Sequence, residues 1–168
     1  MINDQGLPTG PHKPALIALL DELIAAIGAR ELNADLEAML NDRFGPQTEH
    51  FQACTKLLRT GIEENWACYR QIEGPDYRRG RLGLAPESPH DFVIESARLK
   101  NIKGHYHRHP LGEINMIQPL DPDGRFCGSG EGWKVFAPGT SHYPTVTGGA
   151  CTFVFLLPKG EIEYHDAP

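Results

Sequence analysis

The side chains best suited to chemistry in this 168-residue chain are histidines separated by single residues. His105, His107 and His109 alternate with other residue types, and Glu113 follows four positions after the last of them. In a β-strand, alternate side chains point to the same face, about 6.5 Å apart, so neighbouring imidazoles can bind one ion. The Pro-Leu-Gly sequence at 110–112 is typical of a tight turn that brings Glu113 alongside. The spacing therefore predicts a metal site on β-strands.

A further candidate ligand, His142, ends the sequence Pro-Gly-Thr-Ser-His. A second strand could bring it across a barrel to His107, His109 and Glu113. Two or three neutral imidazoles with one carboxylate suit one divalent ion such as Zn, Fe, Mn or Ni, with positions left open for solvent or substrate. The alternative is a polar pocket or general acid/base cluster without a bound ion. His105 is expected either as an extra ligand or as a pocket residue that contacts the substrate.

Two sequence motifs resemble those of the cupin superfamily. They are His-x-His-x3-Glu at 107–113 and Pro-Gly-x2-His at 138–142. Cupins have antiparallel jelly-roll barrels. The resemblance implies a mainly β fold, a cupin-type antiparallel jelly-roll barrel preceded by an N-terminal α-helical segment. Ala137 stands where many cupins have proline, but the following Pro-Gly is expected to preserve the loop.

Apolar residues at helical spacing fill residues 1–73, the predicted N-terminal helical segment. One helix is expected from about 13 to 29. Asn33 is suited to cap a second helix, which Gly45 and Pro46 end, and Thr48 to open a third that runs to about residue 72.

Short apolar segments separated by Gly and Pro occupy residues 91–168, the predicted barrel. The barrel and the helical segment are expected to form one structural unit, joined by a linker at 74–90. The strand candidates are 92–94, 114–117, 133–136 and 152–157.

The predicted linker contains a dense basic cluster, Arg78, Arg79 and Arg81. One interpretation is a solvated loop. The other is that a guanidinium folds over the barrel mouth and pairs with a substrate carboxylate. Tyr143, next to a predicted ligand, is a weaker candidate for substrate contact.

Composition excludes some classes of partner. A net charge of −6 and a pI near 5.7 argue against nucleic-acid binding. No apolar run approaches the length of a membrane span and no secretion signal is recognisable, so a soluble, cytoplasmic protein is expected. Four cysteines without CxxC spacing are expected to be reduced, and Cys127 lies in a Gly-rich loop near the proposed pocket. Cupin barrels commonly pair, so a homodimer is expected.

Three longer stretches, at 104–114, 130–149 and 155–163, resemble the 4-hydroxylaminobenzoate lyase family. The helical part matches that family in general layout. Its members are small cupin-like proteins of bacterial nitroaromatic degradation, which convert 4-hydroxylaminobenzoate to protocatechuate and ammonia. The resemblance implies a lyase that acts on a small aromatic hydroxylamine.

Such a reaction requires cleavage of an N–O bond, attack of water on the ring and hydrolysis of an imine-like centre. A divalent ion bound by the predicted ligands would assist each step. Glu113 and His142 are the expected catalytic residues. One alternative is a metal-dependent cupin dioxygenase or isomerase acting on another small molecule, which oxygen consumption would help to distinguish. A non-catalytic cupin, the other alternative, would bind a ligand without turnover.

Overall fold

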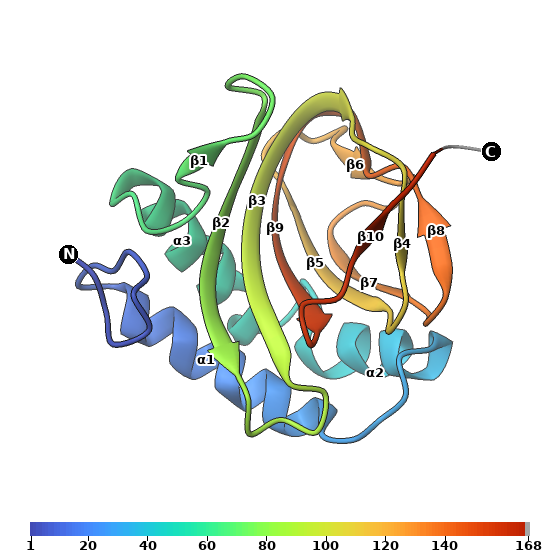
Figure 1. The fold of residues 1–168 in the computed structure, drawn as a ribbon. Helices are drawn as coiled ribbons and strands as arrows, with labels where there is room; N and C mark the ends of the chain where they lie inside the picture. Colours follow the sequence, from blue (N-terminus) through green and yellow to red (C-terminus); the bar gives the residue numbers. More distant parts are fainter. Residues whose placement is uncertain (167–168) are drawn as a thin grey trace.

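Residues 1–166 are described by a computed structural model, which is mainly β with three helices (Figure 1). The pairings between its named strands are antiparallel, which confirms the predicted mainly β, cupin-type fold. The helices are α1 (Lys13–Ile27), α2 (Ala34–Phe44) and α3 (Glu49–Glu63). The strands are β1 (Arg70–Gln71), β2 (Tyr77–Ala85), β3 (Phe92–Lys103), β4 (His107–His109), β5 (Glu113–Pro119), β6 (Arg125–Phe126), β7 (Gly132–Phe136), β8 (Thr140–His142), β9 (Thr145–Pro158) and β10 (Glu163–Tyr164).

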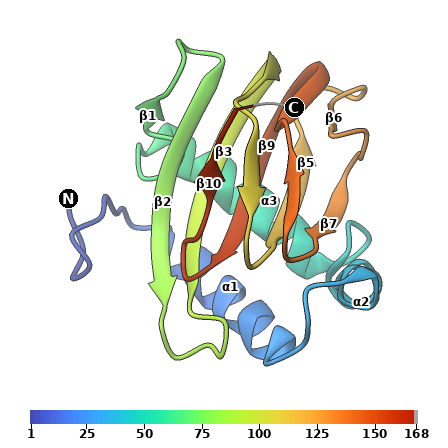
Figure 2. The same cartoon turned by 45° about the vertical axis from the view of Figure 1, so that its right-hand side comes forward.

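Two antiparallel sheets make up the β structure. The large sheet has the strand order β1-β2-β3-β9-β5-β7, with β6 paired to β9. The small sheet has the order β10-β4-β8. Figure 2 shows the small sheet lying in front of the large one, with the helices on the other side. The four predicted strand segments lie within β3, β5, β7 and β9.

The large sheet is buried on both faces, and each face belongs to a different core. Along β9, Val154 and Leu156 pack with the helices, whereas Phe153 and Phe155 belong to the cluster facing the small sheet. This division follows from the two-residue period of a strand, which sends neighbouring side chains to opposite faces. The inner face is therefore available to build a site between the two sheets.

The helices begin where the sequence predicts. The side chain of Asn33 accepts a hydrogen bond from the backbone N–H of Leu36, and Thr48 accepts one from Phe51. The third helix ends at Glu63 rather than near residue 72, because the chain folds back and places the Trp66 ring against Gly61. Within residues 1–166, no helix has the length and apolarity to cross a bilayer.

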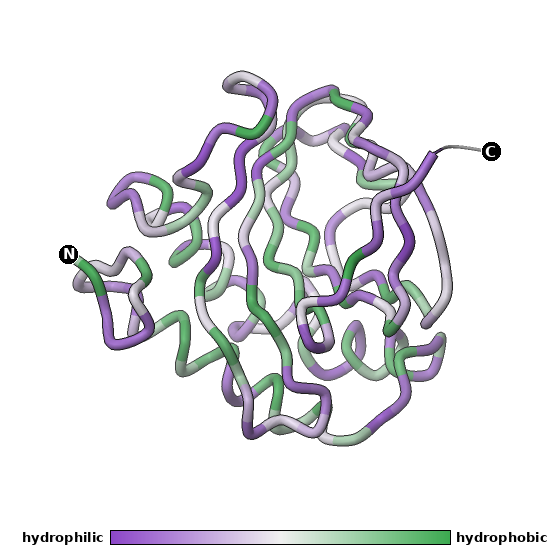
Figure 3. Tube along the Cα trace, viewed as in Figure 1, coloured by the Kyte–Doolittle hydropathy of each residue, from purple (hydrophilic) through white to green (hydrophobic). Residues whose placement is uncertain are grey.

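The expectation of a linker at residues 74–90 is wrong. Most of this segment is β2, which pairs with β3 from Tyr77 to Ala85 around a bulge between Arg81 and Gly83. The barrel therefore begins before residue 91. Its arginines and glycines obscured the strand pattern, because the polar side chains occupy positions where a strand usually has apolar ones. Figure 3 shows this mixed hydropathy along β2, in contrast to the hydrophobic stretch of β9.

Candidate metal centre

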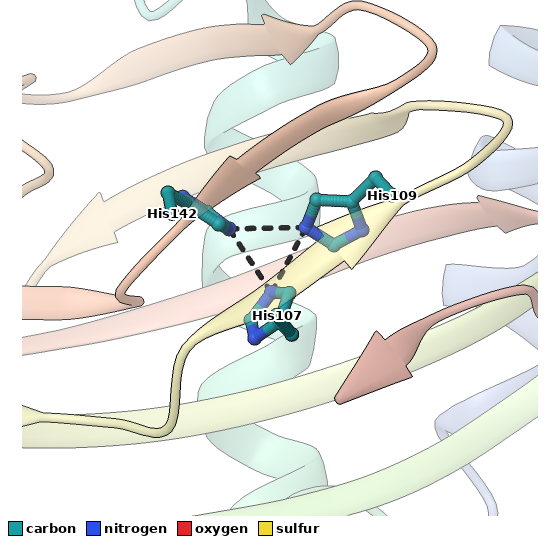
Figure 4. Close-up of side chains that lie close together, drawn as sticks. All are labelled: His107, His109 and His142. Atoms are coloured by element: carbon teal, nitrogen blue, oxygen red, sulfur yellow. Dashed lines mark hydrogen bonds between the residues drawn. The ribbon is translucent and has the colours of Figure 1, made fainter. Parts of the chain in front are cut away.

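Three histidines converge on one point from the small sheet (Figure 4). The Nε2 atoms of His107 and His109 are 2.9 Å apart, and that of His142 lies 3.0 Å from each. His107 and His109 come from β4, and His142 comes from β8. The strand register places His107 directly opposite His142. The predicted convergence of these three side chains is therefore present in the structure.

Two glycine-containing turns hold β4 in this position. The carbonyl oxygen of His109 accepts hydrogen bonds from the N–H groups of Gly112, at 3.2 Å, and Gly139, at 2.8 Å. Gly112 has a φ of +87°, and a Cβ there would lie 2.6 Å from the carbonyl oxygen of Phe136. Only glycine fits such a conformation and such a close approach without strain. The turns of both sequence motifs thus meet at His109.

Hydrogen bonds orient two of the imidazoles. Nδ1 of His107 lies 3.0 Å from the carbonyl oxygen of His105, which can only accept a hydrogen bond, so Nδ1 carries the proton. Nδ1 of His142 lies 3.6 Å from Sγ of Cys127, whose thiol can donate to the carbonyl oxygen of Tyr143, 3.5 Å away. In this arrangement both neutral rings direct the lone pair of Nε2 toward the shared point, as metal ligands require.

The protonation states also suit a cation. Burial lowers the pKa of His109 to about 3 and that of His142 to about 4, and the neighbouring imidazoles add to the effect. Burial also lowers the pKa of His107. All three rings are therefore neutral at pH 7, with lone pairs that would repel one another at 3 Å unless a proton or metal ion lies between them. The donor set fits one divalent ion.

Glu113 lies beside the three histidines. Its Oε2 is 3.6 Å from Nε2 of His109, and its side chain is 7% exposed. Burial raises the pKa of this carboxyl to about 7, while Asn115 and Arg79 act in the opposite direction. In the metal-free protein Glu113 can therefore hold or release a proton near neutral pH, next to Nε2 of His109.

Comparison with known proteins identifies the family. The family model described as 4-hydroxylaminobenzoate lyase matches residues 18–164, most of the chain. The chain belongs to the 4-hydroxylaminobenzoate lyase family. It is therefore an enzyme of the lyase class, and the resemblance found in the sequence is confirmed.

Two curated 4-hydroxylaminobenzoate lyases support this membership over nearly their whole length. The one from Pseudomonas putida is 36% identical over 164 residues, which cover 89% of this chain and 93% of that protein. The one from Nocardioides sp. strain LMS-CY is 37% identical over 146 residues, covering 83% of this chain and 86% of that protein. Among solved structures, an RmlC-like cupin from Ralstonia eutropha has a TM-score of 0.43 at 15% identity, over 60% of this chain and 66% of that one.

The three arginines that were candidates for substrate binding in this lyase-family chain have different surroundings. Arg79 points to the inner face of the large sheet, where its guanidinium lies 5.1 Å from the centre of the Phe155 ring. Arg78 instead donates through Nε to the carbonyl oxygen of Cys68, at 2.8 Å. The side chain of Arg81 is 48% exposed. Arg79 is thus the arginine that lies near Glu113.

His105 and Tyr143 lie apart from the cavity that Arg79 and Glu113 line. The side chain of His105 is 72% exposed and pairs through Nε2 with Glu73. His105 and Tyr143 both line a surface hollow beside the end of β10. The His105 residue contributes to the metal centre through its backbone carbonyl, and Tyr143 through the carbonyl that accepts from Cys127.

Sequence reasoning missed Asn115. Asn115 is 2% exposed and lines the same cavity as Arg79 and Glu113. It stands within an apolar strand segment, two positions after Glu113, so the two-residue period of the strand could have identified it as an inward-facing polar residue.

Proposed function

We propose that this chain converts 4-hydroxylaminobenzoate to protocatechuate and ammonia with the help of one divalent metal ion. The observation that carries the proposal is the meeting of three neutral imidazole nitrogens in a member of this lyase family. The reaction is balanced by one net water: N–O cleavage releases one water, one water adds to the ring, and one hydrolyses the resulting imine. It needs neither an oxidant nor a reductant.

The convergence of the three Nε2 atoms, 2.9 to 3.0 Å apart, suits one divalent ion, and the candidate ions are Zn, Fe, Mn and Ni. When bound, the ion would supply a Lewis acid for the hydroxylamine oxygen and for water.

Glu113 is suited to move the proton that N–O cleavage requires. The leaving hydroxyl must be protonated to depart as water, and Glu113 is the buried carboxyl beside the three histidines that can donate that proton. The resulting carboxylate can then accept a proton from the water that attacks the ring. His107, His109 and His142 would hold the ion, with Cys127 fixing the orientation of His142.

A second role for Glu113, as a fourth ligand, makes a different prediction. If Glu113 binds the ion, Glu113→Gln weakens metal binding. If Glu113 is the proton donor, Glu113→Gln retains the ion and lowers turnover, most strongly for the N–O cleavage step. Isothermal titration with Mn²⁺ alongside measured ammonia release separates these roles.

The activity is tested by incubating the metal-replete protein with 4-hydroxylaminobenzoate and measuring ammonia and catechol formation under anaerobic conditions. The proposal predicts equal amounts of both products without oxygen. A metal-replete, folded sample that releases no ammonia would contradict the substrate assignment. A requirement for oxygen would indicate a dioxygenase instead.

We also propose that the protein acts in the cytoplasm as a homodimer. Family membership supports an enzyme with a small-molecule substrate. Light scattering of the purified chain tests the dimer, which a monomeric mass at micromolar concentration would contradict.

A further inference from the structure

The inner face of the large sheet is an apolar wall that contains a few polar side chains. Its buried core includes Tyr77, Phe126, Phe153 and Phe155. Arg79, Asn115 and Glu113 line the same cavity as these aromatic residues. Burying polar groups in an apolar wall costs free energy unless they are hydrogen-bonded or ion-paired. We therefore expect these three residues to contact a ligand or another polar group.

The charge on this wall is incompletely balanced. Nη2 of Arg79 donates to a carboxylate oxygen, Oε1 of Glu95, at 3.4 Å. The same oxygen lies 3.7 Å from Nη2 of Arg81. Two guanidinium groups thus share one carboxylate at long distances. Arg81 is half-exposed and can be solvated, whereas the Arg79 side chain is 18% exposed. Arg79 therefore retains positive charge that an anionic ligand can neutralise.

Two buried donors beside this charge, Nε of Arg79 and Nδ2 of Asn115, make no well-formed hydrogen bond among the described residues, although Asn115 lies close enough to Glu113 to lower the pKa of its carboxyl. Only 2% of the surface of Asn115 is exposed, and both Arg79 and Asn115 line the cavity. An N–H group left without an acceptor inside a protein is destabilising, so such groups mark where an acceptor binds.

The cavity has the size of a small acceptor group. Its volume is about 40 Å³, which has room for about two or three water molecules or for one carboxylate group. Glu113 borders the cavity and also lies 3.6 Å from Nε2 of His109. The cavity therefore adjoins the metal centre through Glu113.

We propose that Arg79 and Asn115 bind the carboxylate of an aromatic acid substrate. Arg79 supplies the positive charge and Nε, and Asn115 supplies its amide N–H. The positive charge of Arg79 favours the carboxylate at its end of the cavity. The opposite end of the ring, which carries the reacting nitrogen, then faces Glu113 and the three histidines. This proposal rests on the proposed function for the identity of the acid, and on the cavity alone for the carboxylate site.

Direct binding tests the site without turnover. The probe is 4-aminobenzoate, which lacks an N–O bond, titrated into the metal-loaded protein by calorimetry, with aniline as the probe without a carboxylate. Arg79→Met and Asn115→Leu each remove one donor with a side chain of similar size. Each is expected to weaken binding of 4-aminobenzoate about 10- to 100-fold and to leave aniline binding unchanged. Arg59→Met is the control, because it removes the same charge from an exposed position on α3.

Kinetics give a second measurement. With 4-hydroxylaminobenzoate, Arg79→Met should lower kcat/KM by a similar factor. With N-phenylhydroxylamine, which has no carboxylate, the same variant should equal the wild type. Melting curves identify any variant that has not folded, and Asn115→Leu provides the independent variant if Arg79→Met fails to fold.

The outcomes distinguish this proposal from the proposed function. If the wild type releases no ammonia from either hydroxylamine but binds 4-aminobenzoate through Arg79 and Asn115, the lyase reaction is wrong and the carboxylate site stands. If folded Arg79→Met and Asn115→Leu bind 4-aminobenzoate as tightly as the wild type does, the carboxylate site is wrong. Binding of 4-aminobenzoate no tighter than that of aniline by the wild type would overturn it as well.

Discussion

His107 and His142 face each other directly across β4 and β8, with their Nε2 atoms 3.0 Å apart. The strand register thus brings together two imidazoles that are 35 residues apart in the sequence. A cation at this point needs both nitrogens, so His107→Ala and His142→Ala should each weaken Mn²⁺ binding at least about 100-fold. This loss is larger than that expected for a residue that only orients a ligand. Calorimetric titration measures this. His12→Ala, at an exposed position, is the matched control and should bind as the wild type does.

Cys127 should affect metal binding without touching the ion. Its sulfur faces Nδ1 of His142 at 3.6 Å, so Cys127→Ala removes the group that orients this ring. The Kd for Mn²⁺ should rise about 10-fold, with partial recovery in Cys127→Ser, whose hydroxyl can also accept. Cys54→Ala removes a comparable sulfur–imidazole contact to His50 on the helical layer and should leave the Kd unchanged. Equal Kd values for Cys127→Ala and the wild type would show that this contact has no orienting role.

The buried histidines should make the metal-free protein sensitive to acid. The pKa values of His109 and His142 are lowered to about 3 and about 4, while in the unfolded chain they are about 6.5. Between these values the unfolded chain binds more protons, so the free energy of unfolding falls as pH falls below 6.5. The slope is about 1.4 kcal/mol per pH unit for each such proton. Urea unfolding at pH 7, 6 and 5, in a Glu113→Gln background, measures it. Replacement of His109 by Phe should reduce the slope.

Glu113 should act in the opposite direction. Burial raises its pKa to about 7, above the ordinary value of 4.5. The folded protein therefore keeps a proton that the unfolded chain has lost, and this contribution is complete below pH 4.5 and disappears as pH rises through 7. The metal-free wild type should lose stability relative to Glu113→Gln over that interval. A constant difference between the two unfolding free energies from pH 5 to pH 8 would be inconsistent with a buried, proton-holding Glu113.

The two helix caps should contribute to stability alone. Asn33→Ala and Thr48→Ala each remove the acceptor for a backbone N–H in the first turn of a helix. Each should lower the free energy of unfolding by about 1 kcal/mol. Urea denaturation measures the loss, and the Mn²⁺ affinity should not change because the helices lie on the opposite face of the large sheet from the metal centre.

The convergence of three histidines was predictable because its signal is local. Alternation placed His107 and His109 on one face, and the glycine turns identified where the chain reverses. The environment of Arg79 was less accessible to sequence reasoning. Its strand was read as a linker, because an arginine and glycine pattern hides a strand whose inward positions are polar. Asn115 was missed for a different reason, because it is an isolated amide in a correctly predicted apolar strand and only its two-residue spacing from Glu113 marks it as facing inward.

The measurement that tests the central claim most directly is restoration of activity to metal-free protein. Protein stripped with a chelator is titrated anaerobically with Fe²⁺ or Mn²⁺ while bound metal and ammonia release from 4-hydroxylaminobenzoate are recorded together. Activity is predicted to rise in proportion to bound ion, reaching its maximum at one ion per chain, and to stay absent in His107→Ala. Full ammonia release from the stripped wild type, or from His107→Ala without bound ion, would contradict the account.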